Sequence, residues 1–196
     1  MIKKNIVSGE GTDRRAFIKK AGAATIFSAA TLNTGFANSF LPKNKVLKVG
    51  LVGCGGRGTG AAVEALRADP DTVLHAMADA FEDRLVSSLE ILKKVHGPRA
   101  EVKKNMQFVG FDAYQKLIDS GVDVVLLATP PGFRPAHLTA AIDAGKHVFY
   151  EKPVAVDGPG IRKVMEAAKK AKEKNLSIVS GLCFRYDLQK QALFGK

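Results

Sequence analysis

The sequence predicts an α/β fold of the Rossmann type, in which helices cover both faces of a doubly wound parallel sheet. Six short apolar segments are separated by segments in which apolar residues recur with helical spacing. The first apolar segment ends in G-x-G-x-x-G at Gly53, Gly55 and Gly58, and the second ends at Asp79. Strands that alternate with helices of this length pair in parallel through right-handed crossovers, and six of them complete the fold.

The six predicted strands differ in their hydrophobicity. The fourth, VDVVLLAT, is almost wholly apolar, which is typical of a central strand whose two faces are both covered by helices. Pro130-Pro131 ends this strand. The predicted strands span 46–53, 72–79, 106–110, 122–129, 147–150 and 176–184.

Five helices are predicted between these strands, at 58–68, 80–97, 112–121, 135–145 and 157–175. Gly97-Pro98 and Gly145 predict two helix ends. Asp112 is expected to cap the third helix. Four residues of the last helix are expected to face inward, opposite a lysine-rich outer face: Ile161, Val164, Met165 and Ala168.

The composition suits one α/β domain with additional segments. The chain has 196 residues, of which 46% are hydrophobic and 25% charged, so it can bury a substantial core. The net charge is +11, but no basic stripe is interleaved with aromatic residues, which argues against a nucleic-acid partner. Cys54 and Cys183 match neither a metal-binding spacing nor a disulfide framework. Both cysteines are therefore expected to be small buried residues, and no metal site is predicted.

The first 37 residues have the pattern of an export signal. Arg14-Arg15 is followed by Phe17, Ile18 and Lys19, and residues 21–42 contain no charge. This order resembles a twin-arginine signal, which implies the twin-arginine export machinery as a partner and a periplasmic location. A membrane anchor and a basic amphipathic helix are the alternatives, and an anchor needs about 20 strongly apolar residues. N-terminal sequencing of the exported protein tests the expected cleavage after Ala37, and residues 38–45 are expected to be a linker.

The glycine motif lies between a predicted strand and a predicted helix, the context in which it binds a dinucleotide. Gly53 allows the tight turn, Gly55 allows the backbone to approach the pyrophosphate, and Gly58 allows close packing of helix and strand. Unpaired amides at the helix N-terminus then meet the phosphate oxygens. Gly56 belongs to the same loop, and Arg57 either covers the phosphates or is a solvated surface charge.

Asp79 ends the second predicted strand, 21 residues after Gly58. An acidic residue there accepts the adenosine ribose hydroxyls and repels a 2′-phosphate, which favours NAD over NADP. Arg84 opposes this preference if it folds back onto the site. A loop or helix-cap role is the alternative for Asp79.

Two further loops follow the fourth and fifth predicted strands. Thr129, Pro130 and Pro131 form the first, and Glu151, Lys152 and Pro153 form the second. Ligands bind beyond the carboxyl ends of the strands in such sheets, so both loops are expected near the nicotinamide. His137 can reach the same rim, although a surface histidine is the favoured alternative. A salt bridge to Glu151 is the alternative for Lys152.

The stretches GCGGRGTGA, ATPPGFRPAHLTAAIDAGKHVFYEKPVA and GLCFRYD resemble the Gfo/Idh/MocA oxidoreductases over about residues 46–187. The resemblance implies that Lys152 helps to bind a sugar or polyol and relays a proton as its hydroxyl is oxidised. It also implies that Glu151 and Pro153 shape the loop near the nicotinamide.

Members of this family continue into a second α/β domain that holds the substrate and supplies a histidine. In this sequence residues 188–196 are expected to be a truncated tail, with apolar surface exposed near it. Two alternatives remain open, namely an NAD-dependent glycosidase of the same family and a non-catalytic nucleotide-binding module. An oligomer is also left open.

Overall fold

The computed structural model describes residues 46–195, so the expected signal at 1–37 and the linker at 38–45 lie outside the described residues. A six-stranded sheet with the order β3-β2-β1-β4-β5-β6 forms the centre, and every neighbouring pair of strands is parallel. This confirms the predicted Rossmann-type sheet. The strands are β1 (Leu47–Val52), β2 (Thr72–Asp79), β3 (Gln107–Val109), β4 (Val124–Leu127), β5 (His147–Tyr150) and β6 (Ile178–Ser180).

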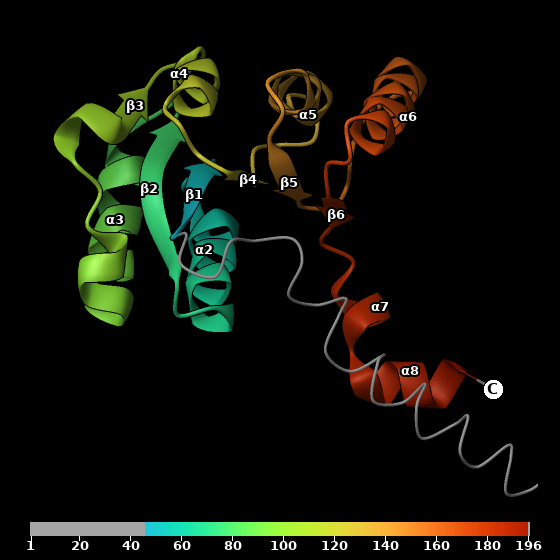
Figure 1. The fold of residues 1–196 in the computed structure, drawn as a ribbon, viewed down its shortest axis with the longest axis horizontal. Helices are drawn as coiled ribbons and strands as arrows, with labels where there is room; N and C mark the ends of the chain where they lie inside the picture. The colour runs from blue at the N-terminus through green and yellow to red at the C-terminus, as the bar shows by residue number, and fades with distance from the viewer. Residues whose placement is uncertain (1–45, 196) are drawn as a thin grey trace, which may run out of the picture. The chain divides into compact units, whose positions relative to one another are not determined.

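Helices cover both faces of the sheet, with α2 and α3 on one side and α4, α5 and α6 on the other (Figure 1). Their bounds are α2 (Gly56–Ala68), α3 (Glu82–His96), α4 (Ala113–Asp119), α5 (Arg134–Asp143) and α6 (Gly158–Glu173). Two short 3-10 turns, η1 (Gly97–Ala100) and η2 (Lys104–Met106), precede β3, and α7 (Cys183–Tyr186) and α8 (Leu188–Phe194) follow β6.

Two hydrophobic cores lie on the two faces of the sheet, because successive strand residues point to opposite sides. Leu51 and Leu126 pack with residues of α2 and α3. Val52 and Leu127, one residue further on, pack with residues of α4, α5 and α6. The alternation explains why the central strands are apolar on both faces.

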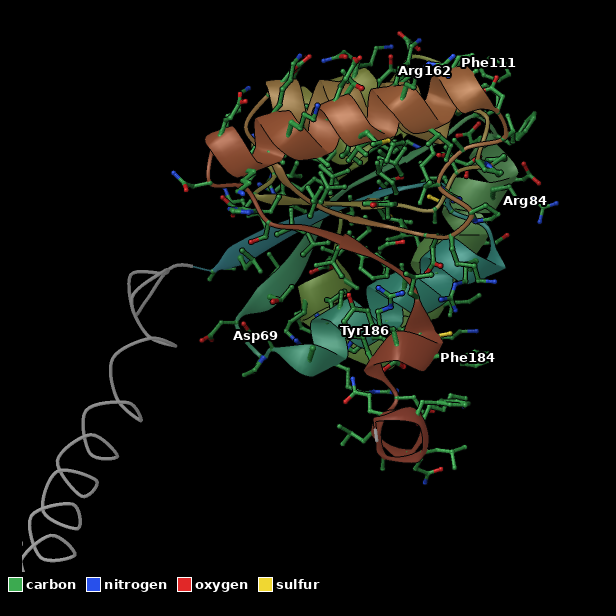
Figure 2. All side chains as sticks on the ribbon, turned by 90° about the vertical axis from the view of Figure 1, so that its right-hand side faces the viewer. Asp69, Arg84, Phe111, Arg162, Phe184 and Tyr186 are labelled. Carbon is green, nitrogen blue, oxygen red and sulfur yellow. The ribbon has the colours of Figure 1, made fainter. Side chains whose placement is uncertain are left out.

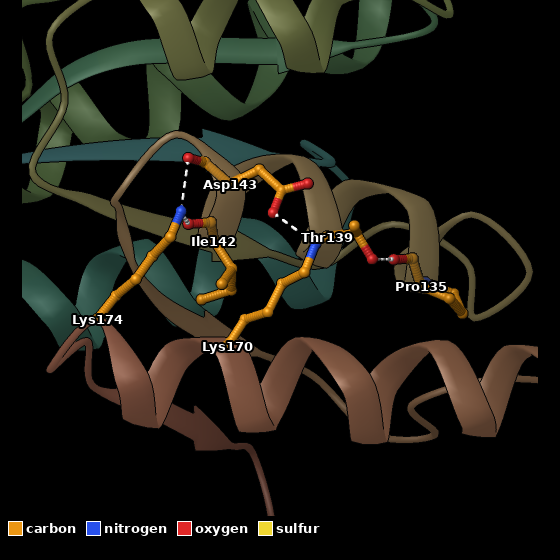
Figure 3. Close-up of polar contacts among 6 residues, drawn as sticks. All are labelled: Pro135, Thr139, Ile142, Asp143, Lys170 and Lys174. Atoms are coloured by element: carbon orange, nitrogen blue, oxygen red, sulfur yellow. Dashed lines mark hydrogen bonds and ion pairs between the residues drawn. The ribbon is translucent and has the colours of Figure 1, made fainter.

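The helix α5 is held against α6 by two lysines near its C-terminus (Figure 3). Lys174 Nζ donates to the carbonyl oxygens of Ile142 at 3.0 Å and Asp143 at 2.9 Å, and Lys170 Nζ donates to Asp143 Oδ1 at 3.0 Å. Cations at the C-terminus of a helix satisfy its last carbonyl groups and interact favourably with the negative end of its dipole. The N-terminus of α5 lies near the carboxyl ends of the strands and carries Arg134 and His137.

The predicted inner face of α6 is partly wrong. Val164 is buried, but Ile161 is 41% exposed and Met165 is 58% exposed. The other buried apolar residues of α6 are Ala167 and Ala171, which lie three and seven positions after Val164. The small alanines allow α6 to lie close to α5, its main neighbour in the fold, and Met165 lies outside this contact.

The end of the last strand also differs from the prediction. β6 stops at Ser180, and Gly181 follows at a point where a Cβ would lie 2.7 Å from Glu151 Oε2. The chain then turns into α7, which leaves Cys183 exposed rather than buried. Phe184 and Tyr186 on α7 are exposed as well (Figure 2).

Asp112 occupies the N-cap position of α4 but its side chain makes no capping hydrogen bond. Its backbone is already helical, with φ −91° and ψ −3°, whereas a capping side chain needs extended backbone geometry. The carboxylate instead pairs with Lys116 Nζ at 2.8 Å, and this contact lowers the pKa of Asp112. The predicted cap is therefore wrong in its chemistry, although the helix begins where expected.

Candidate functional site

A cavity of about 500 Å³ lies at the carboxyl ends of β1, β2, β4 and β5. This is the point where the strand order reverses between β1 and β4, at which ligands bind in sheets of this kind. Four of the sequence-predicted site residues do not line the cavity, although each adjoins a residue of its wall or of the glycine loop: Gly56, Gly58, Pro131 and Pro153. The sequence-predicted residues that line it are Gly53, Gly55, Arg57, Asp79, Arg84, Thr129, Pro130, His137, Glu151 and Lys152.

The glycines of the loop after β1 occupy positions that exclude side chains for different reasons. Gly53 has φ +94°, and a Cβ there would lie 2.7 Å from the Thr129 amide nitrogen. A Cβ on Gly58 would lie 1.8 Å from the Gly53 carbonyl oxygen. A Cβ on Gly55 would meet nothing within 4 Å, so this part of the backbone borders open space.

The N-terminus of α2 begins directly after this loop, with Gly55 as its N-cap. The backbone hydrogen bond from Thr59 N to Gly55 O, at 2.9 Å, closes the first turn. Amides of a first helical turn have no acceptor within the helix, and together with the helix dipole they favour an anion. The loop therefore fits the pyrophosphate of a dinucleotide.

Asp79 connects the end of β2 to the glycine loop. Its Oδ2 accepts a hydrogen bond from Cys54 N at 2.6 Å, and its Oδ1 accepts one from Phe81 N at 3.0 Å. Each carboxylate oxygen retains a further lone pair. Asp79 therefore has the loop role that was expected as the alternative to ribose binding. Its carboxylate can still accept hydrogen bonds from ribose hydroxyls. Burial, with Asp79 as a second cause, raises the pKa of the buried Cys54 thiol.

Two arginines border the cavity from different sides. Arg84 is largely exposed, has its nearest acidic partner at Asp83 (3.9 Å), and lies toward the same end of the molecule as Phe111 (Figure 2). Arg57 is also largely exposed, and its guanidinium lies 2.8 Å from Glu151 Oε1. The Arg57 side chain therefore crosses from α2 to the loop after β5.

Glu151 and Lys152 have contrasting environments although they are adjacent. Glu151 is 2% exposed, and its carboxylate lies between Arg57 and Gly181. Lys152 is exposed on the rim and makes no ion pair within residues 46–195. The alternative predicted for Lys152, a strand-end salt bridge with Glu151, is therefore wrong, because the Glu151 carboxylate pairs with Arg57 instead. The Lys152 amine remains available to a ligand.

His137 is buried in the cavity wall, so the favoured alternative of a surface histidine is wrong. It is 7% exposed, its Nδ1 lies 3.2 Å from Thr129 Oγ1, and its ring stacks on Tyr114 at a centroid distance of 4.0 Å. Burial, and secondarily the charge of Arg134, lowers the pKa of His137 to about 4. The imidazole is therefore neutral near pH 7 and serves as a packed, hydrogen-bonding wall residue.

We expect the protein to lose stability as the pH falls from about 6.5 toward about 4, in part because of His137. In this window the unfolded chain takes up a proton at His137 that the folded chain does not, which favours unfolding by at most about 3 kcal/mol. Denaturant unfolding curves across the window measure the effect. His137→Gln, which stays neutral, should flatten the dependence, and an unchanged slope in this variant would contradict the assignment.

Arg134 and four aromatic residues also line the cavity, although the sequence did not predict them as site residues. Arg134 is 3% exposed at the first position of α5, and it lines the cavity. The aromatic residues of the wall are Phe81, Phe111, Tyr114 and Phe133. Three of the four stand in segments that follow the carboxyl ends of strands, which is the signal that could have identified them.

Within residues 46–195 no cluster of three or more His, Cys, Asp or Glu side chains is arranged to hold a metal ion. In the same part of the chain, no helix combines the length and the apolar character needed to cross a membrane.

Comparison with known proteins places this site in a family. Residues 47–179 match the family model described as "Oxidoreductase family, NAD-binding Rossmann fold". Among curated relatives, a glycosyl hydrolase family 109 protein of Bacteroides fragilis is 31% identical over 133 residues, which are 67% of this chain and 28% of the relative. The myo-inositol 2-dehydrogenase of Thermotoga maritima is 28% identical over 141 residues, which are 72% of this chain and 37% of the relative.

Among solved structures, the fold is similar to that of scyllo-inositol dehydrogenase from Lactobacillus casei, solved with bound NAD(H) and scyllo-inositol. The TM-score is 0.60 at 24% identity, over 76% of this chain and 40% of the other. At this identity the likeness shows the fold alone. The chain spans less than half the length of each of these three proteins.

Proposed function

The chain belongs to the Gfo/Idh/MocA family of NAD-binding oxidoreductases, and on that premise we propose that it is the cofactor-binding part of an enzyme that transfers hydride between a sugar or polyol hydroxyl and NAD. One observation carries the proposal. A single cavity joins the glycine loop, Asp79 and the exposed Lys152, so groups suited to phosphate, ribose and a reacting hydroxyl border the same space.

The residues present fit the dinucleotide. Open space at Gly55 and the N-terminus of α2 suit the pyrophosphate, and the remaining acceptor capacity of Asp79 suits the adenosine ribose. The loops after β4 and β5 border the other end of the cavity, where Thr129, Pro130 and Lys152 would adjoin the nicotinamide. When bound, NAD supplies the hydride acceptor.

In the proposed reaction the unprotonated amine of Lys152 would accept the proton of the substrate hydroxyl, while the carbon bearing that hydroxyl would give up hydride to bound NAD. The amine is suited to this role because it is exposed at the cavity rim and is not engaged by Glu151. His137 and Thr129 close the wall beside it, and their mutual contact fixes both side chains. The relationship to the myo-inositol 2-dehydrogenase of Thermotoga maritima supports a polyol as the substrate class.

Binding and turnover measurements test the proposal. We expect NAD to bind at least about tenfold more tightly than NADP, because the Asp79 carboxylate repels a 2′-phosphate. Titration calorimetry with both cofactors measures this ratio, and Arg84→Ala shows whether Arg84 reduces it. A rise in nicotinamide absorbance with polyols or sugars would support hydride transfer. Absence of NAD binding would overturn the proposal, and binding without turnover would favour a non-catalytic module.

A glycosidase of the same family is the second candidate, and the relationship to the Bacteroides fragilis glycosyl hydrolase family 109 protein favours it. In such a reaction the sugar would be oxidised transiently, the leaving group eliminated, and the sugar reduced again. Release of a chromogenic aglycone without net formation of NADH would distinguish this reaction from a dehydrogenase.

Periplasmic export through the twin-arginine pathway also remains a proposal, which rests on Arg14-Arg15 and the residues that follow them.

A further inference from the structure

The guanidinium of Arg134 joins two loops that border the cavity. Its NH1 donates hydrogen bonds to the carbonyl oxygens of Glu151 and Pro153, and its NH2 donates to the carbonyl oxygen of Thr129. Thr129 belongs to the loop after β4, and the other two acceptors belong to the loop after β5. One buried side chain therefore spans both loops.

These hydrogen bonds begin where the sheet ends. The last backbone hydrogen bond between the two segments runs from Glu151 N to Leu127 O at 3.0 Å. Beyond it, within residues 46–195, the Arg134 guanidinium supplies the hydrogen bonds that connect the two loops. Lys152 stands between two of the three accepting residues, so its backbone is fixed on both sides.

Arginine is the side chain suited to this position. A planar guanidinium carries five N–H donors with fixed directions, whereas a lysine amine acts from a single point and cannot span three carbonyls. Arg134 is 3% exposed, and burial lowers its pKa while the nearby Glu151 charge opposes that effect. Since the terminal nitrogens already serve backbone carbonyls, Arg134 is not a free cation for an anionic ligand.

We infer that Arg134 is a positioning residue, which holds the Thr129-Pro130 loop and Lys152 at the spacing that the nicotinamide half of NAD requires. This inference rests on the proposed function. It predicts that replacing Arg134 weakens the binding of the nicotinamide half of NAD and leaves the binding of the adenosine and pyrophosphate half unchanged. In the described part of the chain the guanidinium donates to neither Asp79 nor the glycine loop, which border the adenosine and pyrophosphate half.

The test compares the affinities for NAD and for ADP, which lacks the nicotinamide riboside. In Arg134→Lys we expect the NAD affinity to fall at least about tenfold and the ADP affinity to change less than about twofold. Arg134→Gln, which removes the buried charge but keeps an amide donor, provides a second variant with the same readout. Titration calorimetry on the full chain measures both ligands.

Arg99 provides the matched control. Its NH1 donates to the carbonyl oxygens of Leu66 at 2.6 Å and Asp69 at 3.1 Å, at the amino end of the sheet and away from the cavity. Arg99→Lys and Arg99→Gln remove a comparable clamp and should leave the ratio of NAD to ADP affinity unchanged.

The outcomes separate this inference from the proposed function. A wild-type protein that binds no NAD overturns the proposed function. If the wild type binds NAD, a parallel loss of NAD and ADP affinity in the Arg134 variants, or no loss of either, overturns the positioning role. If neither Arg134 variant folds whereas both Arg99 variants do, Arg134 is a folding residue and the inference is wrong.

Discussion

Replacing Gly58 by alanine is expected to abolish NAD binding and to destabilise the protein strongly. The added Cβ would lie 1.8 Å from the Gly53 carbonyl oxygen and 3.1 Å from the Ala128 Cβ. Because the closest atom is backbone, relief requires α2 to move away from the glycine loop, at a cost of at least about 3 kcal/mol. Titration with NAD and a denaturant unfolding curve measure the two losses.

Gly60 supplies the control for this prediction because it lies in the same helix two residues later. A Cβ there would meet nothing within 4 Å. Gly60→Ala should therefore bind NAD normally and gain up to about 1 kcal/mol from its higher helix propensity. Wild-type stability and affinity in Gly58→Ala would contradict the packing argument, and losses shared by both variants would indicate a general sensitivity of α2.

Replacing Lys152 by methionine is expected to reduce turnover by about 100-fold to 10,000-fold, the range typical for loss of a general acid or base. The affinity for NAD should stay within about twofold, because the amine is assigned to the substrate hydroxyl and not to the phosphates or the adenosine. The side chain is exposed and makes no ion pair in the described part of the chain, so stability should not change. Steady-state rates with the best polyol or sugar substrate measure the effect.

Lys169→Met is the matched control, since Lys169 is an exposed lysine on α6 and does not line the cavity. It should retain wild-type turnover. Full activity in Lys152→Met would rule out the proton relay. A parallel loss of NAD affinity would instead assign Lys152 to cofactor binding.

The sheet and the dinucleotide loop could be predicted because their signals are local. Strands 72–79 and 147–150 were predicted with the bounds that the structure shows, since a run of apolar residues followed by a turn specifies them directly. Gly53 and Gly58 could be predicted from the glycine motif. A Cβ on Gly58 would clash with Gly53, only five residues away, and a Cβ on Gly53 would clash with Thr129 at the end of the adjoining strand. Cys54 is buried as expected for the same reason.

The errors concern positions where local pattern allows two arrangements. In α6 both the stripe through Ile161 and Met165 and the stripe through Ala167 and Ala171 have helical spacing, and the packing of α6 against α5 selects the second. The segment after Ser180 is apolar enough for a strand, but Gly181 must approach Glu151, and the chain turns there.

Local sequence pattern was sufficient to predict the succession of strands and helices along the chain, the glycine loop, Asp79 at the end of the second strand and Lys152 after the fifth. These features depend on residues that are near one another in the chain, so periodicity and motif spacing report them. The partners of Arg57, Glu151 and Arg134 could be found only in the folded structure. Arg57 pairs with Glu151, 94 residues later, and Arg134 contacts Pro153 across two loops. Burial and ion pairing depend on which loops meet at the carboxyl ends of the strands, and that meeting is set by the packing of the whole sheet.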